Sequence, residues 1–325
     1  MSSYPEYRPR RLRRTSGLRR AFAETAVSPS NLVAPLFLKE GIAEPQPITS
    51  LRGHFQHTPE SLVKEARELA TREVAGVILF GIPQRKDPEG SEAWNPDGIA
   101  QRGLRALKEE LGDDLVVIAD LCMCEYTDHG HCGIVRAESV SNDATIESYG
   151  KIALSQATAG ADVVAPSGMM DGQVGAIRAA LDSSGFEDTA ILAYAAKYAS
   201  SFYGPFREAA EGAPQFGDRR AYQQDPSNLQ EALREAGLDV EEGADALMVK
   251  PALGYLDVLR AVKEKFAYPT AAYNVSGEYA MLIAAAERSW IDERAATLEV
   301  LSSIRRAGAD LILTYHAKQA AEWLS

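Results

Sequence analysis

Eight short apolar runs recur along the chain, and amphipathic stretches lie between most of them. The runs cover residues 32–38, 76–81, 115–121, 162–166, 189–194, 246–250, 270–275 and 310–315. Short, continuously apolar runs are typical of parallel strands that are buried on both faces. The amphipathic stretches include residues 61–71, 99–111, 145–159 and 256–266. Strands that alternate with helices in this way predict a closed α/β barrel of the (β/α)8, or TIM-barrel, type.

A three-residue repeat supports this interpretation. Gly-Ala-Asp occurs at 160–162, 243–245 and 308–310, each time where an apolar run begins. A glycine suits the position that follows a helix, where φ is positive. An open, doubly wound sheet is the alternative. No G-x-G-x-x-G motif follows the first run, which weakens a dinucleotide-binding version of that alternative.

The length of 325 residues suits one barrel domain. We expect residues 1–30, which lack a clear period, to form an N-terminal arm for subunit contacts, and residues 31–325 to form a catalytic barrel. Residues 198–226 combine several glycines and prolines with aromatic residues, and they follow the fifth run. A loop this long in a compact domain is usually functional. We therefore expect it to be a lid, on the face where barrel enzymes carry their active sites.

The charge of the chain is divided unevenly. The net charge is −12, which argues against nucleic acid or an anionic membrane as a partner of the barrel. Seven arginines and no acidic residue lie between Arg8 and Arg20. Such a segment could be a transit peptide, a nucleic-acid arm or an arm that docks on an acidic neighbouring subunit. No apolar run approaches the roughly 20 residues of a membrane span, and the first five residues lack the apolar region of a secretory signal.

Reactive side chains lie at the carboxyl ends of several predicted strands. They are Asp120, Ser167, Lys197, Lys250, Ser276 and Tyr315. In a (β/α)8 barrel this rim carries the active site. The sequence therefore predicts an enzyme with its site at this end of the barrel.

Lys197 and Lys250 follow or end neighbouring predicted strands, which lie about 4.8 Å apart in a sheet. Like-charge repulsion and burial both disfavour the charged ammonium, so we expect the pKa of at least one lysine to fall. A neutral amine near pH 7 is what attack on a carbonyl carbon requires. The alternative is two unrelated lysines, one of them paired with a carboxylate. Arg207 and Arg219 lie in the expected lid and are candidate clamps for a substrate carboxylate.

All three cysteines of the chain, Cys122, Cys124 and Cys132, lie in one short segment. An odd number in one window does not form a disulfide framework and indicates a metal site in a reducing compartment, so we expect a cytoplasmic protein. Thiolate ligands favour zinc, and three protein ligands leave the fourth position open, as in catalytic zinc sites. The adjacent His129 and His131 are expected outside the ligand set. The alternative for the cysteines is small, buried apolar residues.

At these residues the chain resembles the porphobilinogen synthase (5-aminolevulinate dehydratase) family, from about Arg8 to Trp323. The matching segments are RPRRLR at 8–13, DLCMCEYTDHGHCG at 120–133, APS at 165–167, MDGQ at 170–173, KYASSFYGPFR at 197–207, MVKP at 248–251 and VSGEY at 275–279. The resemblance implies a TIM-barrel enzyme that condenses two 5-aminolevulinate molecules to porphobilinogen, with loss of two waters, in tetrapyrrole (haem) biosynthesis.

The resemblance also implies roles for single residues. Lys250 resembles the lysine that forms a Schiff base with the first substrate, whose carboxylate Ser276 and Tyr315 hold. Lys197 resembles the second lysine. The residues implied at the second substrate's carboxylate are Arg207, Arg219 and Gln223, and those implied in substrate binding from the rim and lid are Ser167, Phe202 and Tyr203.

Around the metal, Asp120 resembles a proton-transfer group, and the three cysteines resemble the ligands of the zinc-type branch. Some zinc-type members carry a further cysteine where this chain has Ala221, so a second zinc there is not expected. Glu235 matches a position that binds an activating magnesium near a subunit interface in many bacterial members, where an arm arginine of the neighbour, here Arg13, lies close. The family usually assembles as octamers through the arm. Gly168 and Tyr198 stand at positions where other family members more often have different residues, and we expect neither difference to impair the enzyme.

Two other functions remain open from the residues alone. A class I Schiff-base aldolase would use one lysine and no metal, and the three-cysteine segment argues against it. A zinc-binding nucleic-acid protein would need a basic surface beyond residue 20, and the rest of the chain is acidic. We therefore expect a homo-oligomeric enzyme with no nucleic-acid or membrane partner.

Overall fold

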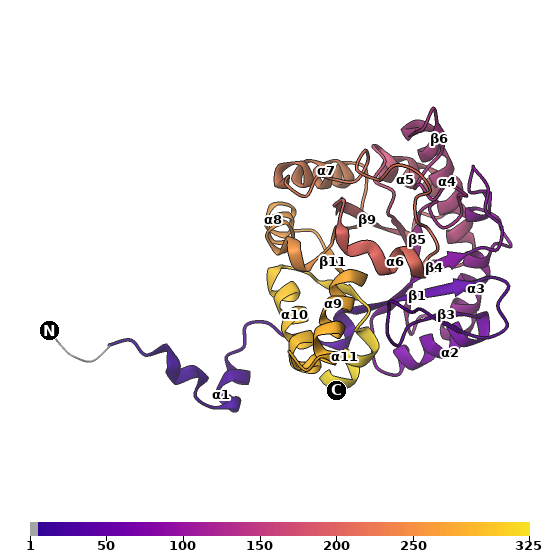
Figure 1. Cartoon of the computed structure of the whole chain (residues 1–325). Helices are drawn as coiled ribbons and strands as arrows, with labels where there is room; N and C mark the ends of the chain where they lie inside the picture. The colour runs from indigo at the N-terminus through magenta and orange to yellow at the C-terminus, as the bar shows by residue number, and fades with distance from the viewer. Residues whose placement is uncertain (1–5) are drawn as a thin grey trace.

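The computed structural model describes residues 6–325 and confirms the predicted barrel (Figure 1). Its parallel strands, in chain order, are β1 (Leu32–Lys39), β4 (Gly76–Ile82), β5 (Val116–Leu121), β8 (Val163–Pro166), β9 (Ala190–Lys197), β10 (Ala246–Lys250), β11 (Thr270–Asn274) and β12 (Leu311–Thr314). Each strand pairs with the next, and β12 pairs with β1 to close the barrel. Each of the eight strands overlaps one of the eight apolar runs, so the alternation of these runs with amphipathic stretches predicted the architecture.

Helices surround the barrel on the outside (Figure 1). They are α2 (Pro59–Ala70), α3 (Ile99–Leu111), α4 (Asn142–Thr158), α5 (Gln173–Ser183), α7 (Leu229–Glu241), α8 (Leu256–Phe266), α9 (Ser276–Glu287), α10 (Glu293–Ala307) and α11 (Ala317–Leu324). The side chain of Thr58 accepts a hydrogen bond from the backbone of Ser61 and caps α2, with Pro59 at the first helical position.

The Gly-Ala-Asp repeat adopts the same local structure at each of its three positions. Its glycines have positive φ angles of 96°, 100° and 126°, as expected after a helix. Each aspartate then accepts a backbone hydrogen bond from the start of the neighbouring strand. The three bonds join Val117 to Asp162 at 2.8 Å, Ile191 to Asp245 at 2.8 Å, and Thr270 to Asp310 at 2.9 Å. These carboxylates fasten adjacent strands together at the amino end of the barrel, opposite the predicted site.

Two layers of buried side chains form the core. One fills the barrel and includes Phe37, Phe80 and Met248. The other lies between the strands and the outer helices. Side chains alternate between these layers along a strand because successive residues point to opposite faces. The interior layer becomes rich in tyrosine toward the carboxyl end, where Tyr194, Tyr273 and Tyr315 lie.

Residues 198–226 are more ordered than a plain loop. They contain a 3-10 turn, η4 (Ser201–Tyr203), and a short helix, α6 (Gly204–Ala209), which Pro205 starts. Figure 1 shows α6 across the centre of the barrel end, among the strand ends. The sequence suggested a long loop there, because six helical residues between glycines and prolines show no clear period. The remaining short strands are β2 (Gln46–Pro47), β3 (Phe55–His57), β6 (Val135–Arg136) and β7 (Ser139–Val140).

The N-terminal segment extends away from the barrel (Figure 1). It contains η1 (Pro9–Arg13) and α1 (Ser16–Ala21), neither of which has a buried residue, and η2 (Pro29–Asn31) leads into the barrel. The first five residues, on which the expectation of no secretory signal rests, lie outside the described part. Within residues 6–325, none of the helices has the length and apolar character needed to cross a membrane.

Candidate active site

Two lysines lie side by side at the carboxyl end of the barrel. Lys197 is the last residue of β9 and pairs with Lys250, the last residue of β10. The predicted strand stopped at residue 194 and placed Lys197 after it; the strand continues three residues further. Both side chains are buried. The juxtaposition expected from neighbouring strands is therefore present.

An extra residue in β9 turns Lys197 toward the barrel interior. Two residues separate Ala193 from Ala196, whereas only one separates their partners Leu247 and Val249. Such a bulge reverses the alternation of side chains beyond it. Ala195 and Ala196 accordingly both belong to the outer layer of the core. Without the bulge, Lys197 would point at the helices and away from Lys250.

Aromatic rings surround the Lys250 ammonium. Its Nζ lies over the rings of Tyr273 at 4.2 Å, Tyr194 and Phe206 at 5.1 Å, and Tyr203 at 5.4 Å. Burial lowers the pKa of Lys250 to about 7, and the neighbouring Lys197 charge acts in the same direction. A substantial fraction of this amine is therefore a neutral nucleophile near neutral pH.

Lys197 belongs to a hydrogen-bonded group with Ser167 and Asp120. Its Nζ donates to the Ser167 carbonyl, and the Ser167 hydroxyl donates to Asp120 Oδ2 at 3.3 Å. Burial raises the pKa of Asp120 to about 7, the Glu125 charge adds to the rise, and the two lysines oppose it. A carboxyl group with this pKa exchanges protons readily at neutral pH, which is the property of a general acid or base.

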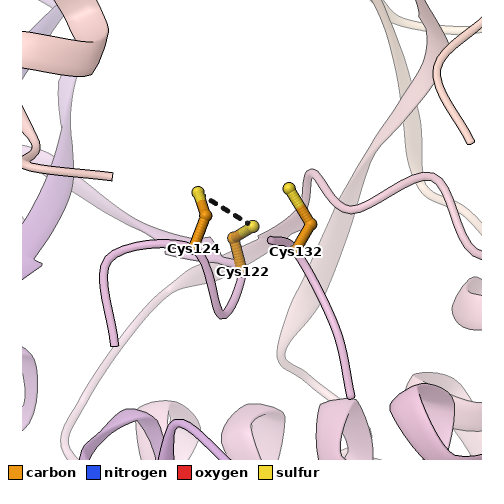
Figure 2. A group of neighbouring side chains, drawn as sticks. All are labelled: Cys122, Cys124 and Cys132. Atoms are coloured by element: carbon orange, nitrogen blue, oxygen red, sulfur yellow. Dashed lines mark hydrogen bonds between the residues drawn. The ribbon is translucent and has the colours of Figure 1, made fainter. Parts of the chain in front are cut away.

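The three cysteines converge in one buried cluster beside this group (Figure 2). Their sulfur atoms all lie within 4.8 Å of one another, and the sulfurs of Cys122 and Cys124 are 3.4 Å apart. Tetrahedral zinc with bonds of about 2.3 Å holds sulfurs about 3.8 Å apart. The sulfur spacing is therefore close to what a tetrahedral metal site requires. Asp120, Cys122 and Glu125 form an overlapping set of donors.

The thiols ionise unequally. Hydrogen bonding by the neighbouring thiols lowers the pKa of Cys132, and the Arg219 charge adds to this. The pKa values of Cys122 and Cys124 are raised. A positive ion would replace protons on all three sulfurs, because thiolates are the metal-binding form. His129 and His131 lie outside this donor set among the described residues, as expected.

Several residues of the segment 198–226 lie against this site. Arg219 is only 7% exposed, and its guanidinium donates to the carbonyls of Gly130, 2.8 Å away, and Gly212. Nε of Arg219, Nε of Arg207 and Nε2 of Gln223 are buried without a hydrogen-bond partner. Unpaired buried donors are costly, so three of them in one segment indicate a place for an anionic or polar ligand.

The residues implied at the first substrate lie around Lys250. Ser276 begins α9, and its hydroxyl accepts from Phe206 N at 3.0 Å and donates to the Phe202 carbonyl at 3.3 Å. Tyr315 follows β12, and its buried hydroxyl has no partner. The Tyr203 hydroxyl donates to the carbonyl of Tyr198 at 2.8 Å, which fastens η4 to the end of β9.

Glu235 lies away from the strand ends, on α7. It lines a cavity of about 420 Å³ whose charged residues are mostly acidic, and which reaches His131 and Tyr222 beside the cysteine segment. Burial raises the pKa of Glu235, and the charge of Asp171 adds to the rise. The cavity therefore has fewer positive than negative side chains, and its carboxylates repel one another.

The sequence singled out only Tyr203 among the four rings around Lys250. Tyr194 and Tyr273 lie within apolar runs and Phe206 within the expected lid, where aromatic residues usually indicate core. The alternation of side chains along a strand could have identified Tyr273, because it places this residue on the face that points into the barrel interior. Glu125 was also missed, although it directly follows Cys124.

Comparison with known proteins gives one consistent result. The family model of delta-aminolevulinic acid dehydratase matches residues 6–323. The enzyme of that name from Mycobacterium tuberculosis is 56% identical over 328 residues, covering 100% of this chain and 99% of the relative, and that from Synechococcus elongatus is 53% identical, covering 99% and 100%. The crystal structure of delta-aminolevulinic acid dehydratase (porphobilinogen synthase) from Toxoplasma gondii, in complex with the reaction product porphobilinogen, matches with a TM-score of 0.95 and 47% identity, over 98% of this chain and 92% of that chain. With a buried lysine pair, a three-cysteine cluster and these full-length matches, the chain belongs to the delta-aminolevulinic acid dehydratase (porphobilinogen synthase) family of enzymes.

Proposed function

We propose that this chain condenses two molecules of 5-aminolevulinate to porphobilinogen, with loss of two waters, at the carboxyl ends of β9 and β10. The observation that carries the proposal is the pairing of Lys197 with Lys250 beside the three-cysteine cluster. Two amines next to each other provide one attachment point for each of two ketone substrates. A class I aldolase needs only one such lysine and no metal.

Lys250 is the nucleophile for the first substrate in this proposal. Its neutral amine attacks the ketone carbon, and water leaves as the Schiff base forms. Ser276 and Tyr315 hold the carboxylate of this substrate. The unpaired Tyr315 hydroxyl supplies one donor, and the Ser276 hydroxyl exchanges its long bond to the Phe202 carbonyl for the carboxylate.

The second substrate binds at Lys197. Arg207, Arg219 and Gln223 supply donors for its carboxylate, and the unpaired nitrogen atoms of these side chains support this role. Asp120 moves protons during the condensation, and Ser167 aligns Asp120 with Lys197. Residues 198–226, which include Phe202 and Tyr203, act as a lid that excludes water.

Cys122, Cys124 and Cys132 are the proposed zinc ligands. Bound zinc would polarise an oxygen of the second substrate through the fourth coordination position. The three sulfur donors support zinc, because soft ligands select it over magnesium. Three thiols that must stay reduced also support action in the cytoplasm.

The N-terminal arm and Glu235 are the proposed assembly elements. Arginines of the projecting arm would dock on a neighbouring subunit in a homo-octamer, with Arg13 close to the acidic cavity around Glu235. The charge of that cavity supports both this contact and a magnesium ion at Glu235. Neither nucleic acid nor a membrane is needed for this function.

One experiment tests the central proposal. The zinc-loaded protein is incubated with 5-aminolevulinate, and the pyrrole product is measured by colour formation and by mass. We expect porphobilinogen, with none formed after chelation and recovery on addition of zinc. Cleavage of an aldol substrate with equal rates in metal-free protein would instead identify an aldolase.

A further inference from the structure

Behind the proposed first-substrate subsite, buried polar side chains form a hydrogen-bonded chain. Its two main-chain ends are the amides of Leu253 and His316. Leu253 N donates to Glu278 Oε1 at 2.7 Å, and Asn274 Nδ2 donates to Glu278 Oε2 at 2.9 Å. The Thr314 hydroxyl then donates to Asn274 Oδ1 at 2.8 Å, and His316 N donates to the same hydroxyl at 3.2 Å. We call Glu278, Asn274 and Thr314 the relay.

The relay lies in the protein interior. Glu278 is 3% exposed, Asn274 is 2% exposed and Thr314 is fully buried. Glu278 also accepts from Val275 N at 2.9 Å, so each carboxylate oxygen has a partner. A carboxylate and an amide cost free energy to bury unless their hydrogen bonds are complete. Complete buried networks of this kind hold their members in one arrangement.

The elements that the relay connects are those that carry the proposed subsite. Leu253 lies three residues after Lys250 at the end of β10, Val275 directly precedes Ser276, and His316 directly follows Tyr315. Backbone pairing between β10 and β11 ends at Val249, and pairing between β11 and β12 ends at Asn274 and Thr314, while Lys250 still pairs with Lys197 on β9. Beyond the ends of these two ladders, the relay joins the segments that hold the three functional groups through buried side chains.

We propose that Glu278, Asn274 and Thr314 are positioning residues, which hold Lys250, Ser276 and Tyr315 at the spacing that a 4-oxo carboxylic acid requires. The proposal rests on the proposed function of this subsite. None of the three touches the substrate. A misplacement of about 1 Å by a distant residue can reduce a rate about 100-fold, so such positioning has measurable consequences.

Thr314 offers the sharpest test, because valine has nearly its shape and serine keeps its hydroxyl. We compare two ketones in borohydride trapping at Lys250: 4-oxopentanoate, which has the carboxylate, and 2-pentanone, which lacks it. Only the first ketone uses the spacing between the lysine and the carboxylate-binding hydroxyls. The measured quantity is the concentration of each ketone that gives half-maximal labelling of the Lys250 peptide, with folding verified by melting temperature.

In the wild type we expect clear preference for the keto acid. Thr314→Val should reduce that preference about tenfold, the equivalent of one lost buried hydrogen bond, and Thr314→Ser should restore it. Glu278→Gln, which keeps the side-chain volume, should act in the same direction. An unchanged preference in a folded Thr314→Val protein would overturn the relay. A wild type that shows no preference, or no label on Lys250, would overturn the proposed function instead.

Discussion

Lys197 and Lys250 occupy paired positions at the ends of parallel strands, yet their ammonium groups have different surroundings. Lys197 donates a hydrogen bond to the Ser167 carbonyl and shares the Tyr194 ring with Lys250, whereas Lys250 also lies over the rings of Tyr203, Phe206 and Tyr273. Under the proposed function, the pairing would give each of the two substrates its own lysine. Burial lowers the pKa of Lys250 to about 7, so much of this amine is neutral near neutral pH.

The pH dependence of covalent trapping should report this difference. The neutral amine reacts, so labelling of Lys250 should rise with pH and level off above about 7, where its pKa lies, and not near the ordinary value of 10.5. Lys197→Met removes a positive neighbour and should move the midpoint to higher pH. Peptide mapping after borohydride reduction at a series of pH values measures both midpoints. Equal midpoints in the two proteins would show that Lys197 does not act on Lys250.

Zinc binding should depend on the cysteines and not on the adjacent histidines. Cys124→Ala removes one of the three proposed sulfur ligands, and we expect the zinc affinity to fall by more than about 100-fold. Loss of a residue that only hydrogen-bonds to a metal ligand lowers the affinity by up to about 100-fold, so loss of a ligand itself should cost more. His129→Ala is the matched control, since His129 lies in the same segment outside the donor set. Chelator competition measures both affinities. Comparable losses in the two variants would refute the three-cysteine site.

Magnesium should act through Glu235. Its raised pKa reflects burial among other acidic groups, so a cation in this cavity relieves repulsion. We expect magnesium to raise activity and to favour the larger oligomer on a sizing column, because a ligand of one assembly state increases its population. Glu235→Ala should lose this response but keep zinc and basal turnover. Glu299→Ala, an exposed position on α10, serves as the control and should respond as the wild type does.

Gly168 should not tolerate a larger residue. A Cβ at this position would lie 1.6 Å from the hydroxyl of Tyr149, which donates to the Cys132 carbonyl at 2.6 Å. Gly168→Ala should therefore lower the free energy of unfolding by about 1–3 kcal/mol, as overpacking does, and weaken zinc binding. The same change should cost less when Tyr149→Leu has removed the hydroxyl. Urea unfolding of the single and double variants measures the coupling, and additive effects would contradict the contact.

Much of the fold and the main chemical groups were predictable from local patterns. Apolar runs located all eight barrel strands, and the position of Lys250 at a strand end indicated the active-site rim. The repeating pattern of apolar residues in strands and helices involves residues that are close in sequence, so it can be detected without knowledge of tertiary contacts. The helix α6 was not predicted, since its six residues are held by contacts with the barrel more than by their own period.

The sequence by itself determined the barrel, the clustering of the three cysteines in one segment and the presence of two lysines near strand ends, because each rests on local spacing. Only the tertiary structure decided that Lys197 faces Lys250, through one extra residue in β9 that no period of the sequence reveals. It also decided which rings enclose Lys250 and which buried groups join Glu278 to Thr314. These relationships connect residues far apart in the chain, so they come into existence only when the closed barrel brings the ends of its strands together.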